Sequence, residues 1–163
     1  MAARDLRSNA SAHLKALINE QLAGIWLGEA RFYDQDGNLQ HTFTTRTCLH
    51  AMGHLFYHQY DLTRTVDSKS YCGVINGRIY PDGLVEFKSS KLRGYGRLEN
   101  ERLTVSWQSK ANSLKITEFL TLFGDNQRIR IRKFHSENGF RGWLESRESR
   151  FTGLQVYHGM SEM

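Results

Sequence analysis

The chain has 163 residues, of which 39% are hydrophobic and 12% aromatic, with a single proline. This length fits one domain, residues 1–163, with a sizeable core, and the composition excludes intrinsic disorder and Pro-rich or Gly/Ser-rich linkers. The net charge of +5 favours an anionic partner but does not choose among a nucleic acid, an acidic protein surface and a carboxylate-bearing ligand.

The absence of certain sequence motifs predicts the binding partners and the cellular compartment of the protein. The basic residues are scattered, with no recognisable nucleic-acid motif, so we expect no nucleic-acid partner. No apolar run has the length of a signal-peptide core or a membrane span, which predicts a cytoplasmic protein without membrane association. The two cysteines, Cys48 and Cys72, lack C-x-x-C spacing, so we expect neither a disulfide framework nor a zinc site.

The first 22 residues contain an amphipathic helix. Leucine and isoleucine side chains recur at helical spacing within residues 5–22, at Leu14, Leu17, Ile18 and Leu22. We expect this apolar stripe to cover an open end or a flank of the domain.

From residue 24 onward the pattern is that of strands separated by turns. Turn residues such as Asp36-Gly37-Asn38 and Pro81-Asp82-Gly83 lie between the alternating segments. Strands joined in sequence without crossover helices hide their edges by closing into a barrel. The fold class is therefore all-β, a lipocalin-like (calycin) up-and-down antiparallel β-barrel over residues 24–151 with an N-terminal helix. The expected strands are 24–34, 39–47, 53–64, 71–79, 84–88, 91–98, 102–108, 114–123, 127–134 and 139–151.

A short motif at the start of the first strand supports this fold. Gly24-Ile25-Trp26 follows the helix directly, and Arg147 and Arg150 lie near the end of the last strand. This arrangement resembles the calycin superfamily, in which a G-x-W tryptophan closes one barrel end beneath a late arginine through packing and a cation-π contact. We expect Trp26 to be such a plug, without a ligand role.

Residues 117–150 form three predicted strands, and the middle one carries what we call the arginine comb: Arg128, Arg130 and Arg132. Side chains alternate across a strand, so the comb occupies one face while Ile129 and Ile131 occupy the other. Two arrangements follow. Either the comb faces the barrel lumen and holds an anionic ligand, or the isoleucines point inward and the arginines form a solvated outer ladder, because unpaired buried charges are costly.

The turn before the comb determines which residue lies beside it. If Gly124-Asp125-Asn126 is a three-residue loop, Phe123 pairs with Gln127 and Glu118 lies opposite Arg132, on the face of the comb.

Histidines recur every four residues at 50, 54 and 58, a spacing that would form a metal site on a helix. The surrounding residues alternate as in a strand, so we expect His54, Phe56, His58 and Tyr60 to line one face without converging on a metal. No metal site is predicted. Aromatic side chains suited to stacking on a flat ligand are Tyr57, Tyr60, Tyr95, Trp107 and Trp143, of which Tyr60 and Trp107 are the candidate ligand contacts.

A longer pattern gives a family resemblance. Glu118, Asn126-x-Arg128-x-Arg130, Gly139-Phe140 and Glu148-x-Arg150 resemble, without a gap, the C-terminal part of the S-type phycobiliprotein lyases, over about a fifth of the chain. The segment after Trp26 departs from that family, and residues 41–108 match none of its patterns. In that family a calycin-like barrel binds an open-chain tetrapyrrole and delivers it to a cysteine of a light-harvesting apoprotein.

The resemblance implies roles for the candidate site residues. Arg128 and Arg130 would bind the bilin propionates, since guanidinium groups bind carboxylates bidentately, and Arg132 is a further candidate ligand contact. Glu118 would face the pyrrole nitrogens and act as the acid or base during thiol addition to the ring A ethylidene group.

The implied function is that of a chromophore lyase. The phycobilin would be a bound substrate with no further cofactor, the phycobiliprotein apo-subunit would supply the nucleophilic cysteine, and a homodimer is compatible. Two alternatives stay open: a non-catalytic carrier of a fatty acid, haem or another pigment, and a calycin-like cyclase of a biosynthetic intermediate.

Overall fold

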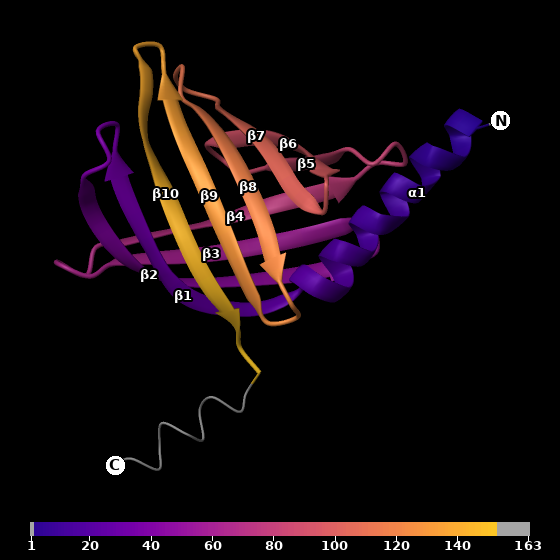
Figure 1. Ribbon diagram of the computed structural model, residues 1–163, viewed down its shortest axis with the longest axis horizontal. Coiled ribbons are helices and arrows are strands. Elements are labelled where there is room, and N and C mark those ends of the chain that lie inside the picture. Colours follow the sequence, from indigo (N-terminus) through magenta and orange to yellow (C-terminus); the bar gives the residue numbers. More distant parts are fainter. Residues whose placement is uncertain (1, 153–163) are drawn as a thin grey trace.

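The computed structural model describes residues 2–152, which form a helical segment and a closed barrel of ten strands (Figure 1). The predicted domain 1–163 includes residues 1 and 153–163, which lie outside the described residues. The helix α1 (Ala2–Ala16) continues into a π-helical turn, η1 (Leu17–Leu22). The strands are β1 (Gly24–Asp34), β2 (Leu39–Met52), β3 (Leu55–Arg64), β4 (Ser70–Ile79), β5 (Val85–Lys88), β6 (Leu92–Glu99), β7 (Arg102–Ser109), β8 (Lys115–Phe123), β9 (Gln127–Ser136) and β10 (Gly139–Arg150).

The topology is the predicted meander. Each strand pairs antiparallel with its neighbours in the sequence, and β1 pairs with β10 to complete the ring. Closure removes the sheet edges that would otherwise pair with other chains. The predicted lipocalin-like barrel with an N-terminal helix is therefore confirmed. Figure 1 shows β8, β9 and β10 crossing in front of β2, β3 and β4, so the lumen lies between these two walls.

The strand boundaries differ from the prediction most clearly around the histidines. β2 continues to Met52, five residues beyond its predicted end, and β3 begins only at Leu55. Gly53 adopts a φ of 65° and forms the intervening turn together with the exposed His54. The expectation that His54 shares a strand face with His58 is therefore wrong, because the turn removes His54 from the strand.

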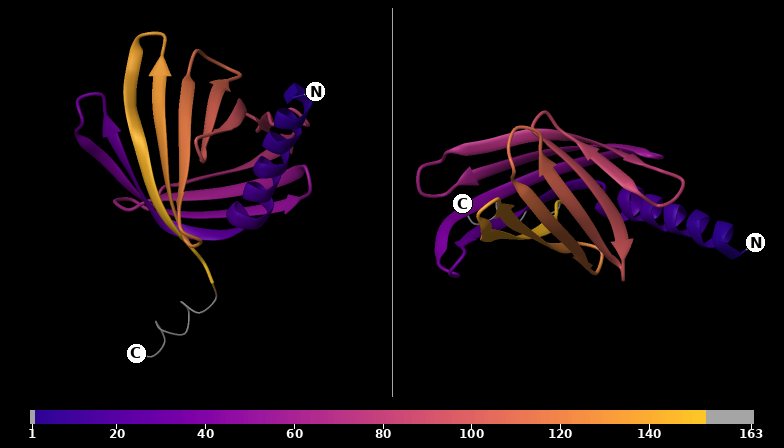
Figure 2. Two further views of the ribbon diagram at one scale, coloured as in Figure 1. Left: turned by 45° about the vertical axis from the view of Figure 1, so that its right-hand side comes forward. Right: turned by 90° about the horizontal axis from the view of Figure 1, so that it is seen from above.

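The helical segment closes the end of the barrel at which β1 begins and β10 ends. Leu14, Ile18 and Leu22 are each at most 2% exposed and belong to one core cluster with Leu49 and Phe56 from the barrel. Figure 2 shows the helix on one side of the barrel, leading into β1. The predicted role of the apolar stripe, to cover an open end, is confirmed. No helix among residues 2–152 has the length and apolar character needed to cross a membrane.

Two glycines explain how large aromatic side chains fit inside so small a barrel. A Cβ atom built at Gly77 of β4 would lie 1.9 Å from the Phe56 ring, and one built at Gly94 of β6 would lie 2.7 Å from the Trp107 ring. The missing side chains leave the room that these two rings occupy. Along β3 to β7 the lumen is thus lined by bare backbone at these glycines, by aromatic rings, and by aliphatic side chains such as Ile75 and Val105.

Candidate ligand-binding site

The arginine comb faces the lumen. Arg128 and Arg130 are 2% and 6% exposed, whereas Ile129 and Ile131 lie half-buried on the outer face of β9. Buried guanidinium groups are tolerated when carboxylates pair with them. The neighbouring strands supply these carboxylates, Glu118 from β8 and Glu148 from β10, which lie opposite Arg132 and Arg128 in the sheet register.

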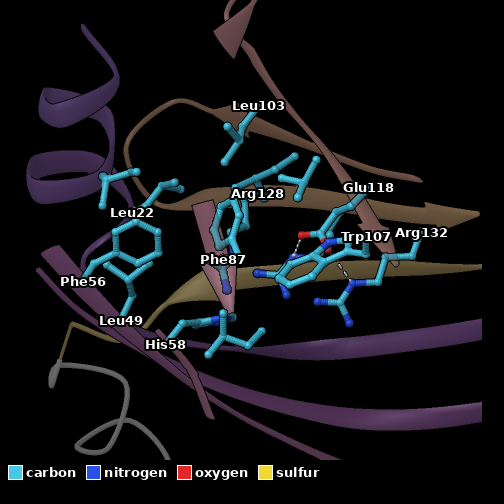
Figure 3. Close-up of a pocket in the computed structure, with 15 residues that line it drawn as sticks. Leu22, Leu49, Phe56, His58, Phe87, Leu103, Trp107, Glu118, Arg128 and Arg132 are labelled. Atoms are coloured by element: carbon cyan, nitrogen blue, oxygen red, sulfur yellow. Dashed lines mark hydrogen bonds and ion pairs between the residues drawn. The ribbon is translucent and has the colours of Figure 1, made fainter. Parts of the chain in front are cut away.

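Glu118 is the centre of one charged cluster. The register of β8 and β9 pairs Phe123 with Gln127 and Glu118 with Arg132, as a three-residue loop requires. Figure 3 shows the Glu118 carboxylate between Trp107 and Arg132. Its Oε2 accepts hydrogen bonds from Arg132 Nε at 2.8 Å and from Trp107 Nε1 at 3.1 Å, and Arg130 Nε lies 3.3 Å from Oε1.

Glu118 is ionised in this environment. Burial disfavours the carboxylate, but the positive charges of Arg132 and Arg130 and the hydrogen bonds from Arg132 and Trp107 outweigh it and hold the pKa of Glu118 below its usual value. The lumen therefore contains a permanent hydrogen-bond acceptor at this position.

Arg128 and Glu148 form a second cluster nearer the closed end. Arg128 Nη2 lies 3.0 Å from Glu148 Oε2, and both side chains are 1% exposed. Thr47 accepts a hydrogen bond from Arg128 and donates one to Glu148 at 3.1 Å. Burial and the repulsion of Arg130 lower the pKa of Arg128 to about 10 against the attraction of Glu148, so it stays charged at neutral pH. Its Nη2 is thus bonded to Thr47 and Glu148, while its buried Nε has no hydrogen-bond partner among the described residues.

Trp26 closes the barrel beneath this cluster. Two guanidinium groups contact its ring, with the Arg128 carbon at 4.5 Å and the Arg150 carbon at 4.6 Å from the ring centroid. Its Nε1 donates a hydrogen bond to the Leu22 carbonyl at 3.0 Å, which ties the plug to η1. The expected tryptophan beneath a late arginine is confirmed for Arg150. Arg147 lies on the outer face instead, paired with Glu145.

Arg130 differs from the other two members of the comb. No hydrogen bond joins its guanidinium to any described residue, and its buried Nε has only the 3.3 Å ionic contact with Glu118. Three arginines and two glutamates face this part of the lumen, which leaves one excess positive charge among the described residues. An anionic group entering the lumen would therefore find an available guanidinium at Arg130.

His58 also lines the site, although in the sequence it stood out only as a candidate metal ligand. It projects into the lumen from β3, is 8% exposed, and its Nε2 has no hydrogen-bond partner among the described residues. Residues 2–152 contain no group of three or more His, Cys, Asp or Glu side chains that could hold a metal ion. The alternation of Phe56, His58 and Tyr60 along β3 is the sequence signal that could have placed it inside.

All six predicted site residues face one lumen. Two cavities of about 40 and 60 Å³ lie within it, and both are lined by Ile75, Trp107 and Arg132. Trp107 and Arg132 therefore form the partition between a cavity near the helix and one near the open end. The predicted residues around the first are Glu118, Arg128, Arg130, Arg132 and Trp107, and those around the second are Tyr60, Trp107 and Arg132.

The other aromatic candidates lie elsewhere. Tyr57 and Tyr95 are 38% and 40% exposed, and Trp143 stacks on Tyr33 with ring centroids 5.0 Å apart. All three belong to strand positions that alternate with the lumen-facing ones, so they cannot contact a ligand inside the barrel.

Comparison with known proteins supports the fold. No protein-family model matches the sequence, and neither does any curated protein. Among solved structures, the chain is similar to the S-type phycobiliprotein lyase CPES from Guillardia theta, with a TM-score of 0.68 and 10% identity over 82% of this chain and 90% of that protein. The resemblance first seen in residues 118–150 thus extends to the architecture of the barrel.

A second solved structure has the same architecture. A protein of unknown function from the DUF3598 family of Nostoc punctiforme aligns with a TM-score of 0.59 and 14% identity, over 80% of this chain. The aligned region is 48% of that protein, so this chain spans about half of its length. At these identities the likeness shows a shared fold.

Proposed function

We propose that this protein binds an open-chain tetrapyrrole in its lumen and attaches it to a cysteine of a phycobiliprotein. The observation that carries the proposal is the buried arginine comb, with an available guanidinium at Arg130 beside the ionised Glu118. The similarity of the barrel to an S-type phycobiliprotein lyase supports this choice of ligand. A bilin presents two propionates and several pyrrole nitrogens, which match these two kinds of group.

The propionates would bind to two members of the comb, Arg130 and Arg132. Arg130 has no hydrogen-bond partner to give up, and the Arg132 side chain, 18% exposed, lines the cavity nearer the open end. Hydrogen bonds between charged groups contribute about 1.5–3 kcal/mol each, more than neutral ones. Arg128 lines the cavity nearer the helix but remains held by Glu148 and Thr47, so its role is to add positive potential there.

Glu118 would act on the tetrapyrrole nitrogens. An ionised carboxylate accepts hydrogen bonds from pyrrole N–H groups and favours the protonated chromophore. In the attachment step the thiol adds across the ethylidene double bond of ring A: the sulfur bonds to the ethylidene carbon, the proton goes to the neighbouring ring carbon, and no group leaves. Because Glu118 is ionised, it acts first as the general base for the thiol proton and then returns that proton to the ring carbon.

The thiol would come from the acceptor protein. Cys72 is exposed, and Cys48 lies on the outer side of β2 beside His50, between the inward-facing Thr47 and Leu49. Neither cysteine of this chain reaches the lumen, so a lyase of this design needs the cysteine of its partner.

Binding requires side chains in the lumen to move. Sites for drug-sized ligands occupy roughly 300–1,000 Å³, whereas the two cavities measure about 40 and 60 Å³. Displacing Arg132 and Trp107 would join the cavities, and a carboxylate ligand would compensate Arg132 for its lost contact with Glu118. The ligand would enter at the open end, because Trp26 and Leu22 fill the other.

A transfer assay tests the proposal. The purified protein mixed with a phycobilin should shift and sharpen the visible absorption band, and addition of an apo-phycobiliprotein should yield an adduct that survives denaturation. Arg130→Leu should weaken binding, whereas Lys133→Leu, an exposed position on the same strand, should not. Glu118→Gln should bind the bilin but slow adduct formation.

The same assay separates the alternatives. An unchanged bilin spectrum with the wild-type protein at micromolar concentrations would contradict the proposal. Bilin binding without an adduct on any apo-phycobiliprotein would make the protein a pigment carrier.

A further inference from the structure

We infer that His58 is a ligand-contacting residue, which forms hydrogen bonds with a neutral lactam group on the edge of the ligand that faces away from the arginine comb. This inference rests on the proposed function and adds to it a second recognition element from the opposite wall of the barrel.

The position of His58 supports a ligand role. β3 is five strands away from β8 in either direction around the ten-strand barrel, so His58 faces Glu118 from the far wall. Figure 3 shows His58 directed into the same space as Trp107 and Glu118. A ligand that lies between the comb and β3 would contact the imidazole on one edge and the arginines on the other.

The missing hydrogen-bond partner of His58 also supports a ligand role. The buried Nε2 has no partner within residues 2–152. A buried polar atom without a partner destabilises the fold, and an apolar residue of similar size would fit the neighbouring Leu49, Phe56 and Ile75 better. A polar side chain kept in this position suits a bound group that completes its hydrogen bonds.

The charges around His58 define the group that it accepts. Arg128, Arg130 and Arg132 on β9 and Glu118 on β8 are the charged residues lining the same cavity, while Tyr60 on its own strand lies 6.4 Å away between ring centroids. Burial and repulsion by the three arginines hold the pKa of His58 well below its usual value, so the imidazole is neutral near pH 7.

A neutral imidazole offers one N–H donor and one lone pair. It therefore lacks the positive charge that would favour a second carboxylate over a neutral group. A lactam presents a complementary N–H and C=O, and the end rings of an open-chain tetrapyrrole are lactams. A bound ligand would thus place its acidic edge toward β9 and its lactam edge toward β3.

Substitution of His58 separates a ligand role from a structural one. We expect His58→Leu to retain or raise the melting temperature while reducing the affinity for a phycobilin about tenfold, the value of one well-formed hydrogen bond. His50→Leu, on the outer side of β2, is the matched control and should bind as the wild type does. If His58→Leu does not fold, His58→Gln, which keeps a donor and an acceptor, replaces it and should retain most of the affinity.

The imidazole of the wild-type protein gives a readout that needs no variant. Nitrogen NMR of ¹⁵N-histidine-labelled protein should show a neutral His58 whose ring signals shift when the bilin binds. Bilin binding with unchanged His58 signals, or equal affinity in His58→Leu, would overturn the inference and leave the proposed function standing. A wild-type protein that binds no bilin would overturn both.

Discussion

The buried ion pair between Arg128 and Glu148 should determine the stability of the barrel, and a matched pair on the surface of the same molecule provides the control. The two pairs have almost equal lengths, 3.0 Å for Arg128–Glu148 and 2.9 Å for Arg147–Glu145. Both side chains of the first pair are 1% exposed, whereas those of the second are 74% and 29% exposed. The two pairs thus differ chiefly in burial, and Arg128 and Glu148 have additional contacts with Thr47 and Trp26.

The expected magnitudes follow from that burial. Removing one partner of a buried pair leaves an uncompensated charge and costs about 3–5 kcal/mol. Glu148→Leu should lie at the lower end of this range, because Trp26 retains its cation-π contact with Arg128. Arg128→Met should lie at the upper end. The double variant removes both charges and should lose less than about 2 kcal/mol, since an apolar pair of similar volume can replace a buried ion pair.

Urea unfolding at pH 7 measures these differences, with Arg147→Met, Glu145→Leu and their double variant as the control series. Each control should change the free energy of unfolding by less than about 1 kcal/mol. If a single variant in the buried pair does not fold, Glu148→Gln keeps a hydrogen-bond acceptor and remains measurable. Losses below 1 kcal/mol in the buried pair, or a double variant as destabilised as the two single losses added, would refute the reasoning.

Three further predictions concern the pH response, the lumen and the helix. The pKa of His58 is lower in the folded protein than in the unfolded chain, so the unfolded state binds the additional proton. The free energy of unfolding should therefore fall as the pH drops below about 6.5. Urea titrations at several pH values should show this dependence in the wild type and its loss in His58→Leu. Gly94→Ala should force Trp107 to move and weaken bilin binding, and an unchanged affinity would show that the ring yields freely. Leu14→Ala, at a fully buried helix position, should cost about 2–5 kcal/mol in thermal or urea unfolding, and a loss below 1 kcal/mol would contradict its role in the core.

Much of the fold followed from local chemistry. The strands were predicted because alternation and turn residues act over a few positions, and the ring closes because a meander of this length has edges to hide. Because the turn at Gly124 has three residues, counting residues along the two strands from that turn pairs Glu118 with Arg132. In contrast, the end of β2 and the start of β3 were placed incorrectly, because Gly53 and His54 fit either an aromatic strand or a turn.

The direction of the comb could not be predicted from the alternation of β9 alone. A strand presents two faces, and burying arginines is unfavourable unless acidic partners are present. Thr47, which accepts a hydrogen bond from Arg128, lies 81 residues away in the sequence. A usable signal was present in the hairpin partners, since Glu118 and Glu148 both lie in register with the comb from its two sides.

The central claim is that the comb binds the carboxylates of an elongated pigment, and the most direct test compares a phycobilin with its dimethyl ester in absorption titrations. The wild-type protein should prefer the free acid by about tenfold to a hundredfold, as expected for charged hydrogen bonds. Arg130→Leu should lose most of that preference, and Lys133→Leu on the outer face of the same strand should keep it. Equal affinity of the wild-type protein for the acid and the ester would contradict the account.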